Sequence, residues 1–405
     1  MIPLVDVQSD ILGAVAPLES AMVPLRDALG LVTARDIVAG EAVPPFANTA
    51  MDGYAVRAGD TAGAAPEAPV RLAVVGELPA GREPTQAVGQ GEAIRIMTGA
   101  PMPDGADAVV MVEYTERDGD SVRVLHVAQP GDHVRLAGGD LARGALVFTA
   151  GTVLGAAHLG VLASLGVHEV QAVRRARVGV LSTGDELVER GELRPGQIRD
   201  SNRPMLLALA AEAGADAVDL GVAPDDEAVI NRTLEDALAS CDVVLTSGGV
   251  SVGEYDYVKA ALDRLGGLQS WQVAIKPAKP LAFGVIGGTP VFGLPGNPVS
   301  SLVSFELFAR PALLQMMGHS RRFRPEVGAA AAHPMPRKPD GKLHLDRVWV
   351  QAEGGGFVAA RTGAQASNVL SAAAAANGLA LLPDGDGVPE GGEVRVMRLD
   401  WPADH

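Results

Sequence analysis

The sequence predicts a multidomain α/β plus β protein, with a central α/β domain built on a mostly parallel sheet. The chain has 405 residues, which is too long for one ordinary hydrophobic core. Strand-like and helix-like segments alternate through residues 174–320, the pattern of βαβ crossovers. On both sides of this region, short alternating apolar runs are broken by Gly, Pro and Asp, which is typical of β-rich domains.

The first two predicted domains lie before residue 174. Residues 1–42 and 136–173 form a discontinuous, largely helical linking domain, because residues 5–35 and Leu154–Gly166 both show helical spacing of apolar residues. We expect these two helical segments to pack together. Residues 43–135 form a β-rich insertion domain, with strands expected at Val70–Val75, Ala93–Ile96, Ala108–Val112 and Val122–Leu125.

The other two predicted domains complete the chain. Residues 174–320 form the α/β domain, and residues 321–405 form a C-terminal β-barrel-like domain with a short helix after Ser367. In the α/β domain we expect strands at Arg177–Leu181, Ala217–Val222, Val243–Leu245 and Pro290–Leu294, and helices at Arg203–Ala213, Glu227–Ser240, Tyr257–Leu265 and Val299–Met317. The expected tail strands are Arg347–Val350, Phe357–Ala359, Leu379–Leu382 and Val394–Leu399.

Composition excludes several classes of function. A net charge of −16 argues against a nucleic-acid-binding protein, whereas an anionic small molecule remains possible because a few cations in a cleft reverse the local potential. The single cysteine, Cys241, excludes an internal disulfide and is expected to be a small buried hydrophobe. The first six residues lack the basic region of a signal peptide, and the apolar stretch Ser300–Gly318 contains Glu306 and Arg310. We therefore expect a cytoplasmic protein without a membrane span.

Polar residues follow two of the predicted parallel strands, where ligands bind in open α/β sheets. After the first strand, Ser182, Thr183 and Gly184 offer hydroxyls and amides to a phosphate, and Asp185 and Glu186 are oxygen ligands suited to Mg²⁺. After Val243–Leu245 comes a glycine-rich turn whose backbone amides can point at an anion. The turn and the acid that follows it comprise Ser247, Gly248, Gly249, Ser251 and Asp256.

Five further segments have a functional interpretation beside a structural one. The loops carrying Asp52 and Thr98 are either simple turns between strands or rigid loops that present these side chains to a ligand. Ser201 or Asn202 caps the helix that follows, leaving Asp200 and Asn202 free to touch a ligand. Lys276 and Lys279, each followed by proline, are either solvated or form an oxyanion site. The turn Leu294-Pro-Gly-Asn-Pro298, with Ser300, offers free N–H groups to an anion.

Taken together, these segments resemble the MoeA-type molybdopterin molybdenumtransferase family, which includes the C-terminal domain of gephyrin. The resemblance spans nearly the whole chain, with its motifs in the order of that family. The motifs are Asn48-Thr-Ala-Met-Asp-Gly-Tyr-Ala55, Arg95-Ile-Met-Thr-Gly-Ala-Pro101, Ser182-Thr-Gly-Asp-Glu-Leu187, Ser247-Gly-Gly-Val-Ser-Val-Gly253 with Asp256, Lys276-Pro-Ala-Lys-Pro280 and Leu294-Pro-Gly-Asn-Pro298.

The resemblance implies a four-domain subunit whose α/β domain is of the molybdopterin-binding type, and a homodimer with its active site between subunits. It implies that adenylylated molybdopterin and molybdate react with the help of Mg²⁺, giving molybdenum cofactor and AMP. By position, it implies catalytic Asp52, Thr98, Glu186 and Asp256, a magnesium site at Asp185, Glu186 and Asp256, and a molybdate cluster of Lys276, Lys279, Ser300, Arg347 and Ser367. The substrate-binding residues are then Ser182, Thr183, Gly184, Asp200, Asn202, Ser247, Gly248, Gly249, Ser251, Pro295 and Pro298.

The chain departs from this family at two loops. Ala137-Gly-Gly-Asp140 stands where the family often has Arg-Gly-Glu-Asp, and Asn368 stands where a histidine is common. Two alternatives remain: a molybdopterin adenylyltransferase, and a non-catalytic scaffold of the same fold. The turn Gly-Gly-Val-Ser-Val-Gly, the β insertion and the tail disfavour the adenylyltransferase. The complete set of acids and lysines favours catalysis over a scaffold.

Overall fold

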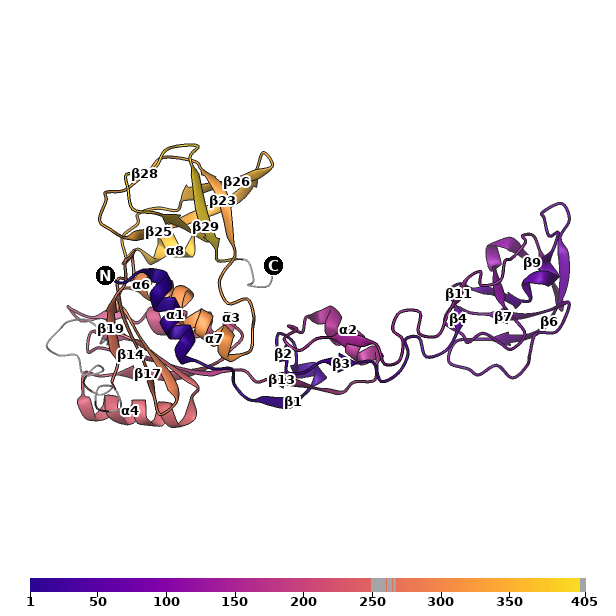
Figure 1. Cartoon of the computed structure of the whole chain (residues 1–405), viewed down its shortest axis with the longest axis horizontal. Helices are drawn as coiled ribbons and strands as arrows, with labels where there is room; N and C mark the ends of the chain where they lie inside the picture. Colours follow the sequence, from indigo (N-terminus) through magenta and orange to yellow (C-terminus); the bar gives the residue numbers. More distant parts are fainter. Residues whose placement is uncertain (249–259, 261–263, 265–266, 401–405) are drawn as a thin grey trace. The chain divides into compact units, whose positions relative to one another are not determined.

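The computed structural model describes residues 1–248, 260, 264 and 267–400. It has two compact units: Met1–Met22, Gly30–Ala34 and Gln171–His405 form the first, and Val23–Leu29 with Arg35–Val170 forms the second. Figure 1 traces both along the chain. Within the described residues, no helix combines the length and the apolar character needed to cross a membrane. The helix expected at Tyr257–Leu265 lies almost wholly outside the described residues.

A six-stranded, mostly parallel sheet forms the centre of the first unit, as predicted. Its order is β17-β14-β18-β22-β21-β19. Four strands are parallel: β17 (Asp216–Ala223), β14 (Arg177–Thr183), β18 (Val243–Ser247) and β22 (Thr289–Leu294). β21 (Pro280–Ile286) pairs antiparallel with β22, and β19 (Gln269–Gln272) pairs antiparallel with β21. The four parallel strands therefore present their carboxyl ends along one edge of the sheet.

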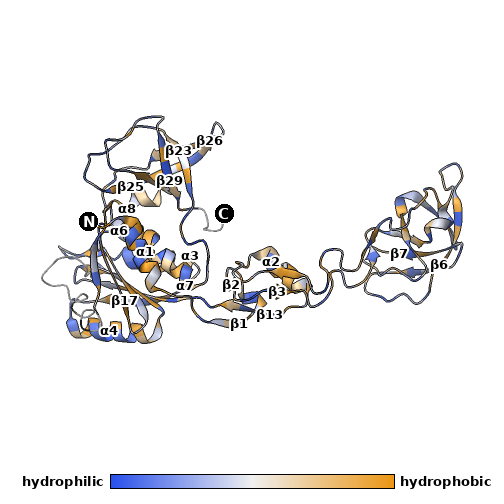
Figure 2. Cartoon of the chain, viewed as in Figure 1, coloured by the Kyte–Doolittle hydropathy of each residue, from blue (hydrophilic) through white to orange (hydrophobic). Residues whose placement is uncertain are grey.

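Helices cover both faces of this sheet (Figure 1). On one face, α4 (Glu227–Ser240) buries Ile230, Leu234 and Ala237, which lie at helical spacing. Figure 2 shows that this helix carries both hydrophilic and hydrophobic residues. Cys241 joins the same small core as a buried apolar side chain. The opposite face has α1 (Leu4–Ala14), α3 (Asn202–Glu212), α6 (Pro298–Ser304), the π-helical η4 (Phe305–Ala309) and α7 (Arg310–Met316).

The expected long N-terminal helix is wrong beyond Ala14. The residues after Ala14 include β1 (Ser20–Pro24), η1 (Leu25–Asp27) and β2 (Val32–Thr33). In a three-stranded sheet, β1 and β2 pair with the two edges of β13 (Glu169–Val173). Pro17 and Pro24 each favour extended backbone in the residue before them. The helix that begins at Leu4 therefore does not continue through this segment.

The expected packing of residues 5–35 against Leu154–Gly166 is wrong for α1 and holds only for η1. Helix α1 packs against α7, where the side-chain amide of Gln315 donates to the carbonyls of Leu12 and Val15 at 2.7 Å each. Helix α2 (Ala156–Ser164) instead contacts η1 in the second unit.

The β-rich insertion has a six-stranded sheet of order β8-β5-β7-β6-β10-β9. The bounds are β5 (Gly53–Val56), β6 (Val70–Leu78), β7 (Glu92–Ile96), β8 (Ala108–Met111), β9 (Thr115–Asp118) and β10 (Ser121–Val124). Smaller elements of this unit are β3 (Ile37–Val38), β4 (Asn48–Thr49), η2 (Ala58–Thr61), η3 (Val112–Tyr114), β11 (Val134–Arg135) and β12 (Leu146–Phe148). Separate apolar clusters fill the sheet's two sides, so the insertion has a core of its own.

The C-terminal region is a closed barrel, as the barrel-like prediction implies. Its strands pair in the cycle β25-β26-β23-β29-β27, and β27 pairs back with β25. The bounds are β23 (Glu326–Ala331), β25 (Leu343–Glu353), β26 (Gly356–Arg361), β27 (Gly378–Leu382) and β29 (Glu393–Arg398), with α8 at Leu370–Ala374. Short pairs occur at β15 (Leu187–Val188) with β16 (Ile198–Arg199) and at β24 (Met335–Pro336) with β28 (Gly387–Val388). Strand β20 (Ile275–Lys276) extends the barrel sheet by pairing with β25.

Candidate functional site

Predicted substrate residues meet at the carboxyl edge of the α/β sheet. In the strand register, Ser182 near the end of β14 lies opposite Ser247 at the end of β18. Ser247 in turn lies opposite Leu294, the residue before Pro295. Gly248 follows directly with φ of +93°, and a Cβ there would lie 3.0 Å from the carbonyl oxygen of Thr183. This position needs glycine for both reasons. The predicted residues Gly249, Ser251 and Asp256 lie outside the described residues.

A buried hydrogen-bond network ties this edge together. The hydroxyl of Ser182, which is fully buried, donates to Asp200 at 3.2 Å. The side-chain amide of Asn202 donates to Ser247 Oγ at 2.8 Å and to the carbonyl of Gly296 at 2.7 Å. Because these groups bond to one another, they position the strand ends and the turn before α6.

Three expectations for this network need correction. The hydroxyl of Ser182 and the amide of Gly184, expected to face a phosphate, are hydrogen-bonded within the protein, the latter to the carbonyl of Ala223 at 3.3 Å. Asp200 is not free for a ligand, because it accepts from Ser182 and from Arg203. Asp200 also caps α3, accepting from the amides of residues 202 and 203 at 3.2 Å each, instead of Ser201 or Asn202.

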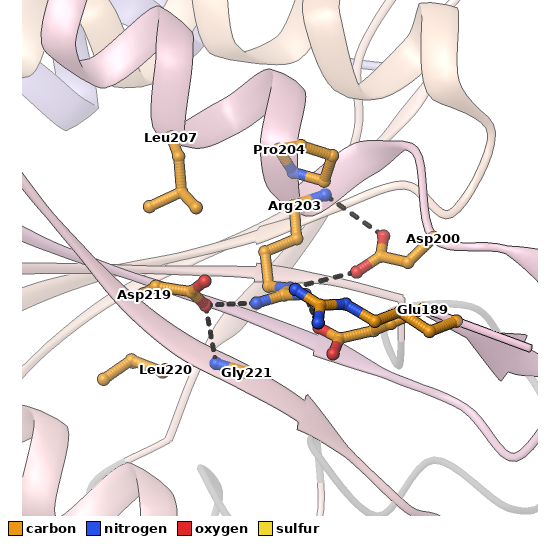
Figure 3. Close-up of a pocket in the computed structure, with 9 residues that line it drawn as sticks. Glu189, Asp200, Arg203, Pro204, Leu207, Asp219, Leu220 and Gly221 are labelled. Atoms are coloured by element: carbon orange, nitrogen blue, oxygen red, sulfur yellow. Dashed lines mark hydrogen bonds and ion pairs between the residues drawn. The ribbon is translucent and has the colours of Figure 1, made fainter.

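A cavity of about 720 Å³ lies beside this network, between the first turn of α3 and the edge strand β17. Figure 3 shows Arg203 at its centre, in contact with the carboxylates of Asp200, Asp219 and Glu189. Burial alone would raise the pKa of Asp219, but hydrogen bonds from Arg203 and the Gly221 amide outweigh it and lower that pKa. Asp219 therefore stays ionised on the wall of the cavity.

The predicted metal ligands Asp185 and Glu186 are exposed at the end of β14. Sequence reasoning missed Asp225, which the structure brings beside them. The amide of Asp225 donates to Asp185 Oδ1 at 3.1 Å, and the amide of Asp185 donates to Asp225 Oδ2 at 3.4 Å. The signal in the sequence was the acidic pair Asp225-Asp226, which follows the strand expected at Ala217–Val222 after two intervening residues. Among the described residues, however, no cluster of three or more His, Cys, Asp or Glu suits a metal ion.

Four of the five residues in the predicted anion cluster line one cavity of about 650 Å³. Lys276 and Lys279 flank Pro277 and Ala278, Ser300 lies in the first turn of α6, and Ser367 precedes α8. The carbonyl of Ser367 accepts from the amide of Val299 at 3.1 Å, which brings the two serine segments together. This bond also corrects one expectation, because the Val299 amide is not free for an anion.

Arg347, the fifth predicted member, occupies a different place. Its side chain is 1% exposed and donates to the carbonyls of Leu345, Ala364 and Ala366. It lines a neighbouring cavity instead of the one with Ser300 and Ser367. Burial is the main cause that lowers the pKa of Arg347. Arg347 thus positions the segment before Ser367.

Asp52 and Thr98, predicted on two separate loops, come together in the second unit. The Asp52 carboxylate accepts from the amide and from the hydroxyl of Thr98, both at 2.7 Å. Both side chains are exposed. The loops also exchange backbone bonds, Thr49 donating to Ala100 at 3.0 Å and Gly99 to Thr49 at 2.9 Å. The result is a rigid, solvent-facing carboxylate.

The parallel α/β sheet with polar strand ends, joined to a β-rich insertion and a closed barrel, defines a class of multidomain α/β proteins with a ligand site at the sheet edge. Three family models match successive regions: the MoeA N-terminal region (domain I and II) over residues 2–166, a probable molybdopterin binding domain over 179–315, and the MoeA C-terminal region (domain IV) over 329–399.

Relatives that match over most of the chain agree with these three family models. Molybdopterin molybdenumtransferase 2 of Mycobacterium tuberculosis is 43% identical over 89% of this chain and 90% of its own. The molybdopterin molybdenumtransferase of Haemophilus influenzae is 37% identical over 93% of each chain. A solved molybdopterin biosynthesis MoeA protein from Pyrococcus horikoshii OT3 matches with a TM-score of 0.81 and 32% identity, over 98% of this chain and all of its own. The chain belongs to the MoeA family of molybdopterin molybdenumtransferases.

Proposed function

We propose that this protein transfers molybdate to adenylylated molybdopterin, giving molybdenum-molybdopterin and releasing AMP. The observation that carries the proposal is the cavity of about 650 Å³ that gathers Lys276, Lys279, Ser300 and Ser367 from three separate segments. Molybdate is a tetrahedral dianion, and two ammonium groups with two hydroxyls supply charge-assisted hydrogen bonds to its oxygens. The whole-chain relatives named molybdopterin molybdenumtransferase support the same reaction.

We further propose a Mg²⁺ site at the end of β14. Mg²⁺ typically takes one or two protein carboxylates together with substrate phosphates and waters, and the bonded loops that carry Asp185 and Asp225 supply two, with Glu186 added from the resemblance. Asp256 remains part of this proposal, from the resemblance. When bound, the ion neutralises charge on the pyrophosphate, which makes AMP a better leaving group. Asp52, held ionised by Thr98, would bind a positively charged or protonated group of the reacting complex.

The direct test is AMP release from adenylylated molybdopterin, with and without molybdate and Mg²⁺. Release that requires both supports the proposal. Folded protein that binds the nucleotide without releasing AMP under any condition would contradict it and favour a scaffold. Glu186→Ala and Asp52→Asn should abolish most release, whereas Glu192→Ala, an exposed acid that follows β15, should not. Full release by either active-site variant would contradict its role.

The anion cluster has its own prediction. Lys279→Ala removes one of the ammonium groups from the 650 Å³ cavity. We expect the molybdate concentration for half-maximal AMP release to rise about tenfold, since one charge-assisted hydrogen bond is lost. Arg26→Ala, which removes an exposed cation in the second unit, is the matched control for net charge. An unchanged molybdate requirement in Lys279→Ala would overturn the assignment.

We also propose a cytoplasmic homodimer in which each active site uses residues from both subunits. Mixing inactive Asp52→Asn and Glu186→Ala chains, after dissociation and reassembly, then creates hybrid dimers with one intact site. About a quarter of wild-type activity should return, because half of the dimers are hybrids with one working site of two. Light scattering checks the dimer itself. No recovery from a verified hybrid population would show that both residues act from the same chain.

A further inference from the structure

We propose that Arg203 is a positioning residue that sets Asp225 opposite Asp185, through a one-residue bulge in strand β17. The inference rests on the proposed function, in which these two carboxylates belong to the Mg²⁺ site. Arg203 itself contacts three other carboxylates, in the cavity of about 720 Å³ that Figure 3 shows. Its effect on Asp225 and Asp185 is therefore carried by the backbone between them.

The pairing of β17 with β14 contains an extra residue on the β17 side. Val180 of β14 lies opposite Asp219, and Ser182 lies opposite Val222. Between these two pairs β14 advances by two residues whereas β17 advances by three, which is the signature of a β-bulge. Every residue of β17 that follows the bulge is thus shifted by one position relative to β14.

Two contacts of Asp219 hold the bulge in place. Gly221, inside the bulge, has φ of +82°, a conformation that glycine adopts readily. Its amide donates to the carboxylate of Asp219 at 2.8 Å. The same carboxylate forms an ion pair with Arg203, whose side chain is only 12% exposed. Among the described residues, no atom lies within 4 Å of a Cβ built at Gly221, so the backbone conformation is what favours glycine there.

The bulge decides which residue comes level with Asp185. After it, Ala223 lies opposite Thr183, and two residues further along both strands Asp225 reaches Asp185. The amide of Asp225 donates to Asp185 Oδ1 at 3.1 Å, and the amide of Asp185 donates to Asp225 Oδ2 at 3.4 Å. Without the extra residue, Pro224 would take this place, and Asp225 would move by about 3.3 Å along the strand. Proline has no amide to donate, so the reciprocal bonds would be lost.

Arg203 also connects the bulge to the substrate edge of the sheet. Its Nε atom donates to Asp200 Oδ2 at 3.1 Å, and the other oxygen of Asp200 accepts from the hydroxyl of Ser182 at 3.2 Å. The side chain of Asp200 is 2% exposed, so solvent hardly screens this contact. A planar guanidinium group can serve several carboxylates at fixed angles, whereas the ammonium group of lysine is a compact point charge. We therefore expect that lysine cannot replace Arg203.

Hydrogen exchange and metal binding, both measured on the whole chain, test the proposal. In Arg203→Lys and in Gly221→Ala, the amides of residues 219–226 should exchange faster, as followed by mass spectrometry without metal. Mn²⁺, a probe of the Mg²⁺ site detected by electron paramagnetic resonance, should bind about tenfold more weakly, as is typical when a partner behind a metal ligand is lost. Asp225→Asn identifies the part of the Mn²⁺ signal that belongs to this site.

Two matched controls separate positioning from a general loss of stability. Arg174→Lys changes an arginine that also contacts two carboxylates, those of Glu19 and Asp242, but before the amino end of β14. Gly214→Ala introduces the same side chain at a similar φ of +87°, after the end of α3. Both controls should keep the natural exchange of residues 219–226 and the natural Mn²⁺ affinity, whatever they cost in urea unfolding.

Unchanged exchange or unchanged Mn²⁺ affinity in folded Arg203→Lys would overturn the proposal. If that variant does not fold, Gly221→Ala decides by the same two criteria. Equal losses in the controls would also refute it, because they would show a nonspecific effect. A natural protein that binds no Mn²⁺ would contradict the Mg²⁺ site of the proposed function, and hydrogen exchange alone would then decide the role of Arg203. Arg203-dependent Mn²⁺ binding without any AMP release would contradict the proposed function and leave this inference standing.

Discussion

The Asp52 carboxylate shows how one neighbouring residue fixes a protonation state. The amide of Thr98 is the largest cause that lowers the pKa of Asp52, followed by the Thr98 hydroxyl, and Arg95 adds a favourable charge. Slight burial acts in the opposite direction without cancelling them. Because the folded pKa lies below the ordinary value, any stabilisation from ionised Asp52 is present above that ordinary pKa and is lost as pH falls through the lowered one.

Replacing Thr98 tests this coupling. Thr98→Val removes the hydroxyl and keeps the amide, so the pKa of Asp52 should rise part of the way to its ordinary value. The acid limb of AMP release should move to higher pH in parallel. Thr98→Ser keeps both donors and should behave like the natural protein. Carboxyl ¹³C NMR titration measures the pKa directly, and identical titrations for all three proteins would contradict the coupling.

At the scale of elements, the continuous helical segment α6–η4–α7 contains a buried charge cluster. Glu306, with 2% of its side chain exposed, accepts from Arg324 at 2.9 and 3.0 Å and lies 3.9 Å from Arg310. The apolar residues around it belong to the main core. Buried charges of this kind are retained only while they compensate one another.

Glu306→Ala should therefore lower the free energy of unfolding by about 3 kcal/mol, because two buried guanidinium groups lose their shared carboxylate. Glu326→Ala breaks the exposed pair with Arg395 and should cost less than about 1 kcal/mol. Tryptophan fluorescence during urea unfolding measures the stability of the unit that contains Glu306, since all three tryptophans lie in Gln171–His405. Equal effects for the two variants would refute the predicted difference.

At the scale of the whole molecule, the two units have separate cores. The apolar clusters of the β-rich insertion use residues from Tyr54 to Val134 only. The chain enters and leaves this insertion as a bonded pair of segments: the amide of Val43 donates to Leu141 at 2.8 Å, and that of Leu141 to Val43 at 3.0 Å. Such a region has the anatomy of an independent domain.

A fragment of residues 43–141 should therefore fold alone. We expect dispersed amide NMR signals, cooperative unfolding in urea, and the same lowered pKa of Asp52 as in the intact chain. The last measurement distinguishes a native fragment from a merely compact one. A fragment that stays unfolded, although the intact chain keeps its structure, would show that the insertion depends on the rest of the molecule.

Local patterns in the sequence determined most of the elements and the positions of the candidate groups. The helix at Glu227–Ser240 has the expected bounds, because its apolar spacing and Asp226 cap are encoded within a few residues. The turns after β14 and β18 follow apolar strands, so sequence alone places Ser182 and Ser247 at one sheet edge. The family motifs add Asp52 and Thr98 as candidate residues, and the hydrogen bond between them appears only in the structure.

Only the tertiary structure decided which distant groups meet. Helix α1 packs on α7 across some 300 residues of sequence, and Asp225 reaches Asp185 through the pairing of β17 with β14. The register of β25 places Arg347 at a cavity that the segment Lys276–Pro277 also lines. Hydrophobic burial and strand order determine these contacts, and neither leaves a signal within a window of neighbouring residues. The chemistry of each group is therefore local, whereas the assembly of the site depends on long-range packing.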